Sequence, residues 1–212
     1  MSYKLCGVIL AAGASSRMGR DKALLPWPPT AGAAGASTGQ TLLSAAIAAL
    51  QSQCDAVMVV VGRNAAAVAH AISAGGAEMV VNPDPDRGQF SSLQTGLREA
   101  VSRGYNAAMI TPVDCPPLAA GTLVRLRRAF DGAVAAGKWA VAPEHDGRHG
   151  HPLLAGRALI DAFLMAPATS NAREVKHAHE EAIETVSVPE PLLAVDLNTP
   201  EEYAALSVER AS

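Results

Sequence analysis

Short runs of β-branched and aliphatic residues alternate along this chain with longer Ala- and Leu-rich stretches of helical periodicity. Because parallel strands need a helical crossover between them, this alternation predicts βαβ units and a mainly parallel sheet. The length of 212 residues fits one compact domain, which we expect to cover residues 1–212. The expected architecture is a three-layer α/β/α, Rossmann-like fold, in which ligands bind at the carboxyl ends of the strands.

The individual elements are predicted from these patterns and from the residues that flank them. Strands are expected over 5–10, 56–61, 78–81 and 107–111, with a fifth over 138–142, and helices over 41–52, 64–74, 91–103 and 119–136. Thr41, Asn64 and Ser91 are of the types that cap helix N-termini. A polar, Gly-rich loop or hairpin follows at 143–151. Beyond it we expect helices near 156–165 and 171–182, strands around 183–188 and 192–196, and a last helix from Thr199.

Composition excludes several classes of protein. Lys and Arg number 17 against 20 Asp and Glu, so no basic excess favours nucleic acid. Aromatic residues make up 4% of the chain, which leaves little material for stacking bases. Cys6, Cys54 and Cys115 form no C-x-x-C pair, which predicts reduced thiols in a cytoplasmic protein.

Two segments imitate targeting or membrane signals. Lys4, an apolar run over 5–12 and a small-residue triplet resemble a signal peptide, but the same residues open a better motif, so we expect no leader. Residues 23–54 carry no charge, but prolines break the segment, and its apolar part over 42–50 is too short to span about 30 Å of hydrocarbon. The Gly- and Ala-rich run 28–39 predicts a loop, either a lid or a tolerated insertion.

The strongest motif is the run from Leu10 to Lys22, L-A-A-G-A-S-S-R-M-G-R-D-K. It follows the first expected strand directly, which places it at the carboxyl end of the sheet. Small residues let backbone N–H groups approach phosphates, and Arg17 and Lys22 add positive charge. The spacing is neither that of a Walker A loop nor G-x-G-x-x-G. Alone, the run is also compatible with a Gly-rich turn that carries solvated charges.

The pattern L-A-A-G-x-S-x-R-M-G-x-x-K resembles the opening signature of the MobA-like nucleotidyltransferases. Four further stretches agree with that family in order and spacing. The resemblance implies a nucleotidyltransferase fold. It also implies a nucleotide site at Leu10, Ala11, Ala12, Gly13, Arg17 and Lys22.

Two of the four stretches lie in the first two thirds of the chain. Asn82 to Leu97 is similar to the family's N-P…G…S-L…G-L, which adds Asn82 and Ser92 to the expected nucleotide site. Thr111-Pro112-Val113-Asp114 ends the fourth strand, where a carboxylate can hold Mg²⁺ beside substrate phosphates. Arg17, Lys22 and Asp114 are therefore the expected catalytic residues.

The other two stretches lie near the C-terminus. Gly147 to Pro152 looks like the family's loop that faces the acceptor, which implies acceptor contacts at Gly150 and His151. Metal binding by the histidines around this loop is the disfavoured alternative. The stretch Val195 to Tyr203 supplies Asp196 and Asn198, on the end of an expected strand, as candidates for the second metal ligand. The sequence does not choose between them.

The resemblance implies transfer of an NMP from an NTP to a phosphorylated acceptor, molybdopterin being favoured, with release of pyrophosphate. CTP is favoured because Ala12 stands where guanylyltransferases usually carry Gly, although Thr-Pro-Val-Asp-Cys-Pro is closer to the guanylyl pattern. The stretch 168–175 keeps only the Ala-Arg of the cytidylyl pattern, which leaves the acceptor open. Alternatives are a guanylyl- or sugar-phosphate nucleotidyltransferase and a non-catalytic nucleotide-binding regulatory module. A cofactor product would be delivered to a molybdoenzyme or chaperone.

Overall fold

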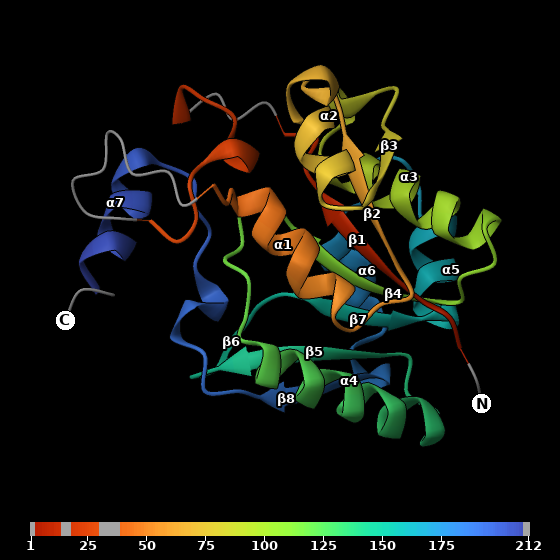
Figure 1. Ribbon diagram of the computed structural model, residues 1–212. Helices are drawn as coiled ribbons and strands as arrows, with labels where there is room; N and C mark the ends of the chain where they lie inside the picture. The colour runs from red at the N-terminus through yellow and green to blue at the C-terminus, as the bar shows by residue number, and fades with distance from the viewer. Residues whose placement is uncertain (1–2, 14–17, 30–38, 210–212) are drawn as a thin grey trace.

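The computed structural model describes residues 3–13, 18–29 and 39–209, without the side chains of 207–209. Within these ranges the strands form one eight-stranded sheet in the order β3-β2-β1-β4-β7-β5-β6, with β8 paired to β5 (Figure 1). The strands are β1 Leu5–Leu10, β2 Ala56–Val61, β3 Glu78–Val81, β4 Ala107–Pro112, β5 Ala140–His145, β6 Arg148–His149, β7 Leu153–Gly156 and β8 Ile183–Ser187. The helices are α1 Leu42–Gln51, α2 Ala65–Ala74, α3 Gln89–Ser102, α4 Ala120–Ala135, α5 Arg157–Met165, α6 Ala172–Ala178 and α7 Pro200–Glu209.

The sheet is parallel from β3 to β4 and mixed beyond it. β1 pairs in parallel with both β2 and β4, and β2 pairs in parallel with β3. β7 lies antiparallel between β4 and β5, while β8 runs parallel to β5. Leu10 is in register with Pro112, so the loops after β1 and β4 leave the sheet side by side. The expected α/β fold with a mainly parallel sheet is confirmed.

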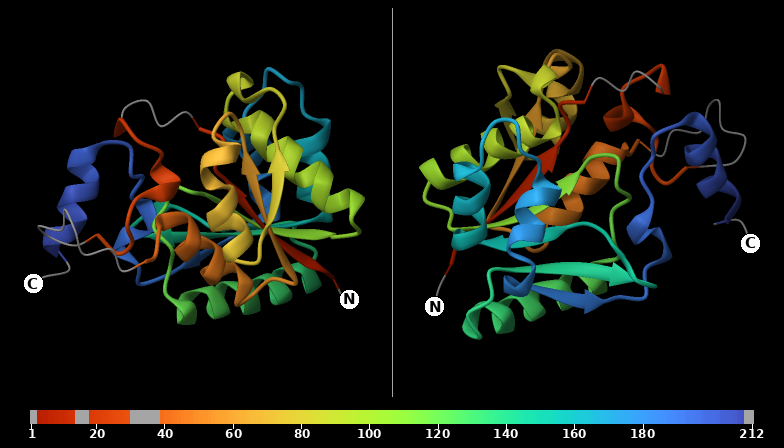
Figure 2. Two further views of the ribbon diagram at one scale, coloured as in Figure 1. Left: turned by 45° about the horizontal axis from the view of Figure 1, so that its top comes forward. Right: turned by 180° about the vertical axis from the view of Figure 1, so that it is seen from behind.

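Helices cover both faces of the sheet and create two apolar layers (Figure 2). α1, α2 and α4 pack on one face, where Ile9, Val59 and Phe130 are fully buried. α3, α5 and α6 pack on the other, around residues such as Val8 and Phe163. Because side chains alternate along a strand, β1 supplies residues to both layers and is buried along its whole length.

Helix α3 approaches the sheet closely because one of its residues has no side chain. A Cβ atom at Gly96 would lie 2.7 Å from Val60 Cγ2 and 2.8 Å from Val8 Cγ1. This helix therefore lies close against β1 and β2, and its N-terminus comes to the carboxyl ends of the strands.

The last helix packs on a third, smaller cluster at one end of the molecule. α7 contributes Leu206, which is buried together with Trp27, Leu42 and Leu197. Tyr203 on this helix donates a hydrogen bond of 2.5 Å to Pro26 O. The C-terminal segment is thereby attached to the region that follows the Gly-rich motif.

One of the three predicted helix caps is wrong. Thr41 caps α1 in a reciprocal capping box with Ser44, as predicted. α3 begins at Gln89 after Gly88, and Ser91 lies in its first turn, where its Oγ donates 2.8 Å to Gly88 O. Gly88 has φ 89°, a conformation that favours glycine. Asn64 is the N-cap residue of α2, as predicted, but its side chain makes no hydrogen bond to that helix, because it turns toward the Gly-rich motif.

Several predicted strands and helices differ from those observed. The segment 192–196 is not a strand: Pro191–Ala194 forms the 3₁₀ helix η5, because Pro191 lacks an N–H and Leu193 packs inward. β7 was not predicted, since four apolar residues between a loop and a helix carry no clear period. β5 covers 140–145 rather than 138–142, and the helix expected over 171–182 ends at Ala178, before the 3₁₀ helix η4, Glu180–Ala182.

Two further sequence predictions concern loops and membrane segments. The run 28–39 contains residues 30–38, which lie outside the described residues. Among the residues that the structure describes, no helix has the length and apolar character needed to cross a bilayer.

Candidate active site

A cleft of about 860 Å³ opens at the carboxyl ends of β1, β2 and β4, where the Gly-rich motif leaves the sheet. Many of the predicted site residues line it: Leu10, Ala11, Ala12, Gly13, Lys22, Ser92, Asp114 and Asn198. Arg17 lies outside the described residues. The cleft is therefore where the sequence places the nucleotide site.

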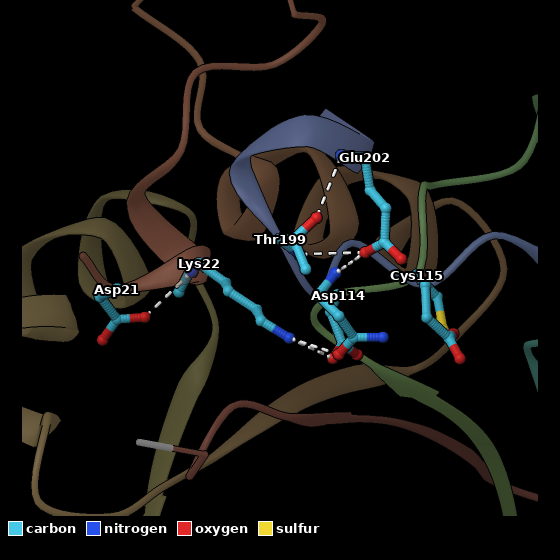
Figure 3. A network of polar contacts seen from close by, with 9 residues as sticks. Asp21, Lys22, Asp114, Cys115, Thr199 and Glu202 are labelled. Carbon is cyan, nitrogen blue, oxygen red and sulfur yellow. Dashed lines mark hydrogen bonds and ion pairs between the residues drawn. The ribbon is translucent and has the colours of Figure 1, made fainter. Parts of the chain in front are cut away.

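Lys22 makes the central contact of the cleft. Its Nζ lies 3.0 Å from Asp114 Oδ2 and donates 2.9 Å to Asn198 Oδ1 (Figure 3). The Lys22 side chain is 12% exposed and that of Asp114 is 25% exposed. An ion pair so enclosed is screened less by salt than a surface pair. Three segments far apart in sequence thus meet at one ammonium group.

Local structure fixes each partner of this contact. Lys22 begins the 3₁₀ helix η2, Lys22–Leu24, which is capped by Asp21 through a 3.0 Å bond to Ala23 N. Asp114 follows β4, and its backbone carbonyl accepts 3.0 Å from Leu197 N. This backbone bond holds the C-terminal segment beside β4 and brings Asn198 within reach of Lys22.

A capping box at the start of α7 positions Asn198. Thr199 Oγ1 accepts from Glu202 N at 3.2 Å, and Glu202 Oε2 accepts from Thr199 N at 3.0 Å (Figure 3). The same Glu202 oxygen accepts from Asn198 N at 2.6 Å. Thr199 and Glu202 thus form a reciprocal capping box, which also holds the backbone of a site residue.

Asp196 and Asn198 occupy different surroundings, which the sequence did not distinguish. The prediction that they end a strand is wrong, since they follow η5. Asn198 lines the cleft, whereas Asp196 is exposed, is not among the lining residues and accepts a 3.4 Å hydrogen bond from Cys115 Sγ. Burial, together with the charges of Asp114 and Asp196, raises the pKa of the Cys115 thiol far above its ordinary value. That thiol stays protonated at neutral pH and is unsuited to act as a nucleophile.

Asn82 lies behind the wall of the cleft rather than on it. It is buried, and its Nδ2 donates to the hydroxyls of Ser91 and Ser92, at 2.9 Å each. Its Oδ1 accepts from Asp84 N at 3.0 Å. Asn82 thus holds the loop before α3 to the first turn of that helix, and Ser92 is the member of this group that faces the cleft.

A second pocket of about 470 Å³ adjoins the cleft and shares Leu10, Gly88 and Gln89 with it. Its lining is largely apolar, and the polar lining residues include His151 and the basic residues Arg87, Arg173 and Lys176. Burial, together with the charge of Arg173, lowers the pKa of Lys176. A cationic pocket of this kind favours an anionic ligand.

His151 and Gly150, the two predicted acceptor residues, have different roles in the structure. Burial and the charge of Lys176 lower the pKa of His151, so this imidazole is neutral at pH 7. Its Nδ1 lies 3.4 Å from Ile110 O, which leaves Nε2 as a hydrogen-bond acceptor. Gly150 is not in the lining: a Cβ there would lie 2.3 Å from Leu193 O. Gly150 therefore lets η5 pack against the loop after β6.

The sequence analysis missed several residues that line the cleft and the second pocket. Arg20, Arg63, Asn64 and Asp86 line the cleft, and Lys176 lines the second pocket. Arg63 and Asp86, both in the lining, form an exposed ion pair. For Arg63 and Asn64 the sequence did hold a signal. The stretch Gly62-Arg63-Asn64 directly follows β2 and therefore lies at the carboxyl end of a strand, where α/β folds bind ligands. Among described residues, no cluster of three or more His, Cys, Asp or Glu side chains forms a metal centre.

The fold and the cleft define an α/β protein with a polar ligand site at the carboxyl ends of its parallel strands. The chain belongs to the MobA-like NTP transferase family, whose domain model matches residues 7–183.

Two relatives align over most of their length. A molybdenum cofactor guanylyltransferase from Xanthomonas euvesicatoria pv. vesicatoria is 30% identical over 204 residues, 94% of this chain and 93% of the relative. The molybdenum cofactor cytidylyltransferase of Escherichia coli is 25% identical over 201 residues, 92% of each chain.

The chain spans little more than half the length of other relatives. A probable molybdenum cofactor guanylyltransferase from Rhodopirellula baltica is 32% identical over 126 residues, 59% of this chain and 56% of the relative. Nicotine blue oxidoreductase from Paenarthrobacter nicotinovorans is 38% identical over 122 residues, 57% of this chain and 54% of the relative.

Solved structures agree on the fold. Rv0371c from Mycobacterium tuberculosis superposes with a TM-score of 0.76 at 23% identity, over 97% of this chain and 98% of that one. A complex of the same protein with manganese gives a TM-score of 0.70 at 22% identity, over 97% of this chain and 98% of that one.

Proposed function

We propose that this protein moves a nucleoside monophosphate from an NTP to a phosphorylated acceptor, the molybdopterin form of the molybdenum cofactor, and releases pyrophosphate. The observation that carries the proposal is the contact of Lys22 with Asp114 and Asn198 inside a cleft that adjoins a second, cationic pocket. A cleft and a neighbouring pocket at one sheet edge suit two anionic substrates that must react with each other.

The proposed reaction needs no general base. An acceptor phosphate oxygen bonds to the α-phosphorus of the NTP, and the bond from that phosphorus to the bridging oxygen of pyrophosphate breaks. A phosphomonoester has a second pKa of about 6, so the nucleophile is mostly dianionic at neutral pH. The enzyme has to align the two phosphates and stabilise the charge that moves onto the leaving group. Lys22 is the described cation best placed to do so, because its ammonium lies within the cleft.

The residues of the cleft fit Mg²⁺ as the cofactor. A carboxylate oxygen of Asp114 and the amide oxygen of Asn198 lie 3.0 Å and 2.9 Å from the Lys22 ammonium, so two hard oxygen ligands converge on the point that this cation holds. The ammonium would give up this place to Mg²⁺ bound by these oxygens and would then face the substrate phosphates. Mg²⁺ takes one or two protein ligands of this type beside substrate phosphates and water. When bound, it would neutralise charge on the triphosphate as pyrophosphate leaves. Asn198 is our choice for the second ligand, because Asp196 does not line the cleft.

The second pocket is our proposed acceptor site. Lys176 and Arg173 lie close enough for Arg173 to lower the pKa of Lys176, and an acceptor phosphate between them would relieve that repulsion. The neutral His151 offers a hydrogen-bond acceptor for an amide or amine N–H of a flat heterocycle. Gly150 acts indirectly in this proposal, by allowing the loop that carries His151 to pack on Leu193.

We propose CTP as the nucleotide. Ala12 lines the cleft, and its methyl group occupies space that a glycine would leave to a larger base. The names of the relatives favour GTP, since most of them are molybdenum cofactor guanylyltransferases or probable ones, and one is a cytidylyltransferase. A direct comparison of the two nucleotides is therefore the first measurement to make.

The test is a pyrophosphate-release assay with the purified protein, Mg²⁺ and each of the four NTPs. Molybdopterin and a sugar phosphate serve as alternative acceptors, and mass spectrometry identifies the product. The proposal expects release that depends on molybdopterin and yields its dinucleotide. Release with the sugar phosphate alone would reassign the acceptor, and nucleotide binding without release under any condition would overturn the enzymatic function.

A further inference from the structure

Asn64 stands in the N-cap position of α2, yet its side chain makes no hydrogen bond to that helix. Its Nδ2 donates to Ala11 O at 3.0 Å and to Asp21 Oδ2 at 2.7 Å. Its Oδ1 accepts from Gly62 N at 3.1 Å, which fixes the orientation of the amide. Both N–H donors and the oxygen are thus used to join the end of β1, the residue before η2 and the end of β2.

Asp21 carries this connection to the start of η2. One of its carboxylate oxygens accepts from Asn64, and the other accepts from Ala23 N at 3.0 Å. A carboxylate held at both oxygens fixes where the 3₁₀ turn begins. The bond to Asn64 is charge-assisted and only partly exposed to solvent, which makes it stronger than a bond between neutral groups.

Lys22 is the first residue of that turn, so its backbone position depends on the cap. Its ammonium reaches Asp114 and Asn198 at distances of 3.0 Å and 2.9 Å. Ordering a long, flexible side chain costs conformational entropy, and a fixed backbone position reduces the number of arrangements that have to be given up to make both contacts. The chain of contacts therefore runs from Asn64 through Asp21 to the backbone of Lys22.

We propose that Asn64 is a positioning residue, which acts through Asp21 to hold Lys22 at the carboxylate and amide of the cleft. Without Asn64, one oxygen of Asp21 loses its donor, and the carboxylate becomes able to turn toward the neighbouring ammonium of Lys22. The turn and the ammonium then sample other positions. The effect on catalysis rests on the proposed function, whereas the effect on the position of Lys22 does not.

The first experiment measures the position of Lys22 without any substrate. The full-length protein is treated with a lysine-acylating reagent, and mass spectrometry follows each site; the exposed Lys4 and Lys138 serve as internal references. In Asn64→Ala we expect Lys22 to react about tenfold faster relative to those references, the scale of losing one or two hydrogen bonds. Asn106→Ala is the matched control and is read against Lys138 alone, since Asn106 accepts from the backbone N–H of the other reference, Lys4, at 2.8 Å and lies outside the cleft. An unchanged ratio in a folded Asn64→Ala protein would overturn the proposal.

A charge exchange tests whether the effect passes through Asp21, and it also serves if Asn64→Ala does not fold. Asn64→Asp keeps the acceptor for Gly62 N but removes the donor to Ala11 O and sets a second carboxylate against Asp21, so Lys22 should again react faster. Adding Asp21→Asn restores a donor–acceptor pair and should return the ratio toward that of the unaltered protein. The double variant still lacks the bond to Ala11 O, so if it is as reactive as Asn64→Asp alone, that bond and not the one to Asp21 carries the effect, and the proposal is overturned.

Kinetics then separate this role from a purely structural one. We expect Asn64→Ala to lower the rate per folded molecule by roughly 10- to 100-fold, the scale of displacing a reactive group by about 1 Å. In a Lys22→Ala background, the same change should cost little more, because the group it positions is gone. If Asn64→Ala lowers the rate by the same factor in the Lys22→Ala background as in the unaltered protein, the proposal is contradicted. If the unaltered protein transfers no nucleotide, the proposed function fails, and the labelling result still decides the role of Asn64.

Discussion

The amide oxygen of Asn198 accepts a 2.9 Å hydrogen bond from Lys22, although 176 positions separate the two residues. The bond joins the turn after the Gly-rich motif to the residue just before α7. It depends on two local devices, the Asp21 cap of η2 and the Thr199–Glu202 capping box of α7. Segments from the N-terminal and C-terminal parts of the chain thus meet in the lining of the cleft.

Removing the ammonium of Lys22 should affect turnover far more than stability. Lys22→Met keeps much of the apolar stem but removes the charge, and we expect the rate to fall by about 100-fold or more, the scale of losing one charge-stabilising group. Lys138→Met, at an exposed site outside the cleft, is the control and should keep the full rate. Pyrophosphate release at saturating NTP measures both, and an undiminished rate in Lys22→Met would disprove the assigned role.

Asp114→Asn should abolish most of the Mg²⁺-dependent turnover while the fold persists. The substitution keeps the shape of the side chain but removes the charge that suits a hard cation. Rates across a Mg²⁺ titration, with thermal melts on the same samples, separate metal binding from folding. Asp161→Asn, which changes an exposed ion pair with Arg157 on α5, is the matched control. A normal rate with unaltered Mg²⁺ dependence in Asp114→Asn would mean that this carboxylate is not a ligand.

Ala12→Gly should shift nucleotide preference toward GTP. Removing one methyl group from the cleft wall changes discrimination by about 10- to 200-fold when that group contacts the base. The ratio of kcat/KM for CTP to that for GTP is the quantity to compare between the two proteins. If the unaltered protein already uses GTP as well as CTP, or if the ratio does not move, Ala12 does not determine base choice.

Gly150→Ala should destabilise the protein, because the new Cβ would lie 2.3 Å from the Leu193 carbonyl oxygen. Overpacking of this kind costs roughly 1–3 kcal/mol of unfolding free energy. Gly132→Ala, in the interior of α4 with no atom within 4 Å of the new Cβ, should instead stabilise by about 0.5–1 kcal/mol. Urea denaturation of both variants provides the comparison. Equal denaturation midpoints for Gly150→Ala and Gly132→Ala would show that η5 moves to admit the new Cβ without a loss of unfolding free energy.

Stability should fall as the pH drops below about 6.5, the ordinary pKa of histidine, in part because of His151. Burial and Lys176 lower the pKa of this imidazole in the folded state, so the unfolded chain binds a proton first. The unfolding free energy therefore rises with pH in this window, by at most about 1.4 kcal/mol per pH unit for one group. His151→Asn should flatten the dependence between pH 5 and 7, and an identical slope in the two proteins would exclude His151 as its source.

The parallel half of the sheet was accessible from local sequence. β1, β2 and β3 have the predicted bounds, and β4 extends by one residue, since each is a short β-branched or aliphatic run between helical stretches. The Gly-rich motif, Lys22 and Asp114 could be placed at the ligand edge because they follow such strands. The antiparallel strand β7 could not, as its four residues become a strand only by pairing with β4 and β5.

The sequence by itself determined the α/β class, the family resemblance and the edge of the sheet that carries the cleft, because strand period and motif spacing are local properties. Only the tertiary structure decided that Asn198 rather than Asp196 meets Lys22, that Asn64 serves Asp21 rather than its own helix, and that Lys176 joins His151 in a second pocket. Each of these outcomes depends on contacts between segments tens to more than a hundred residues apart. Such contacts depend on how the layers of the fold pack, so they cannot be predicted from patterns of neighbouring residues in the sequence.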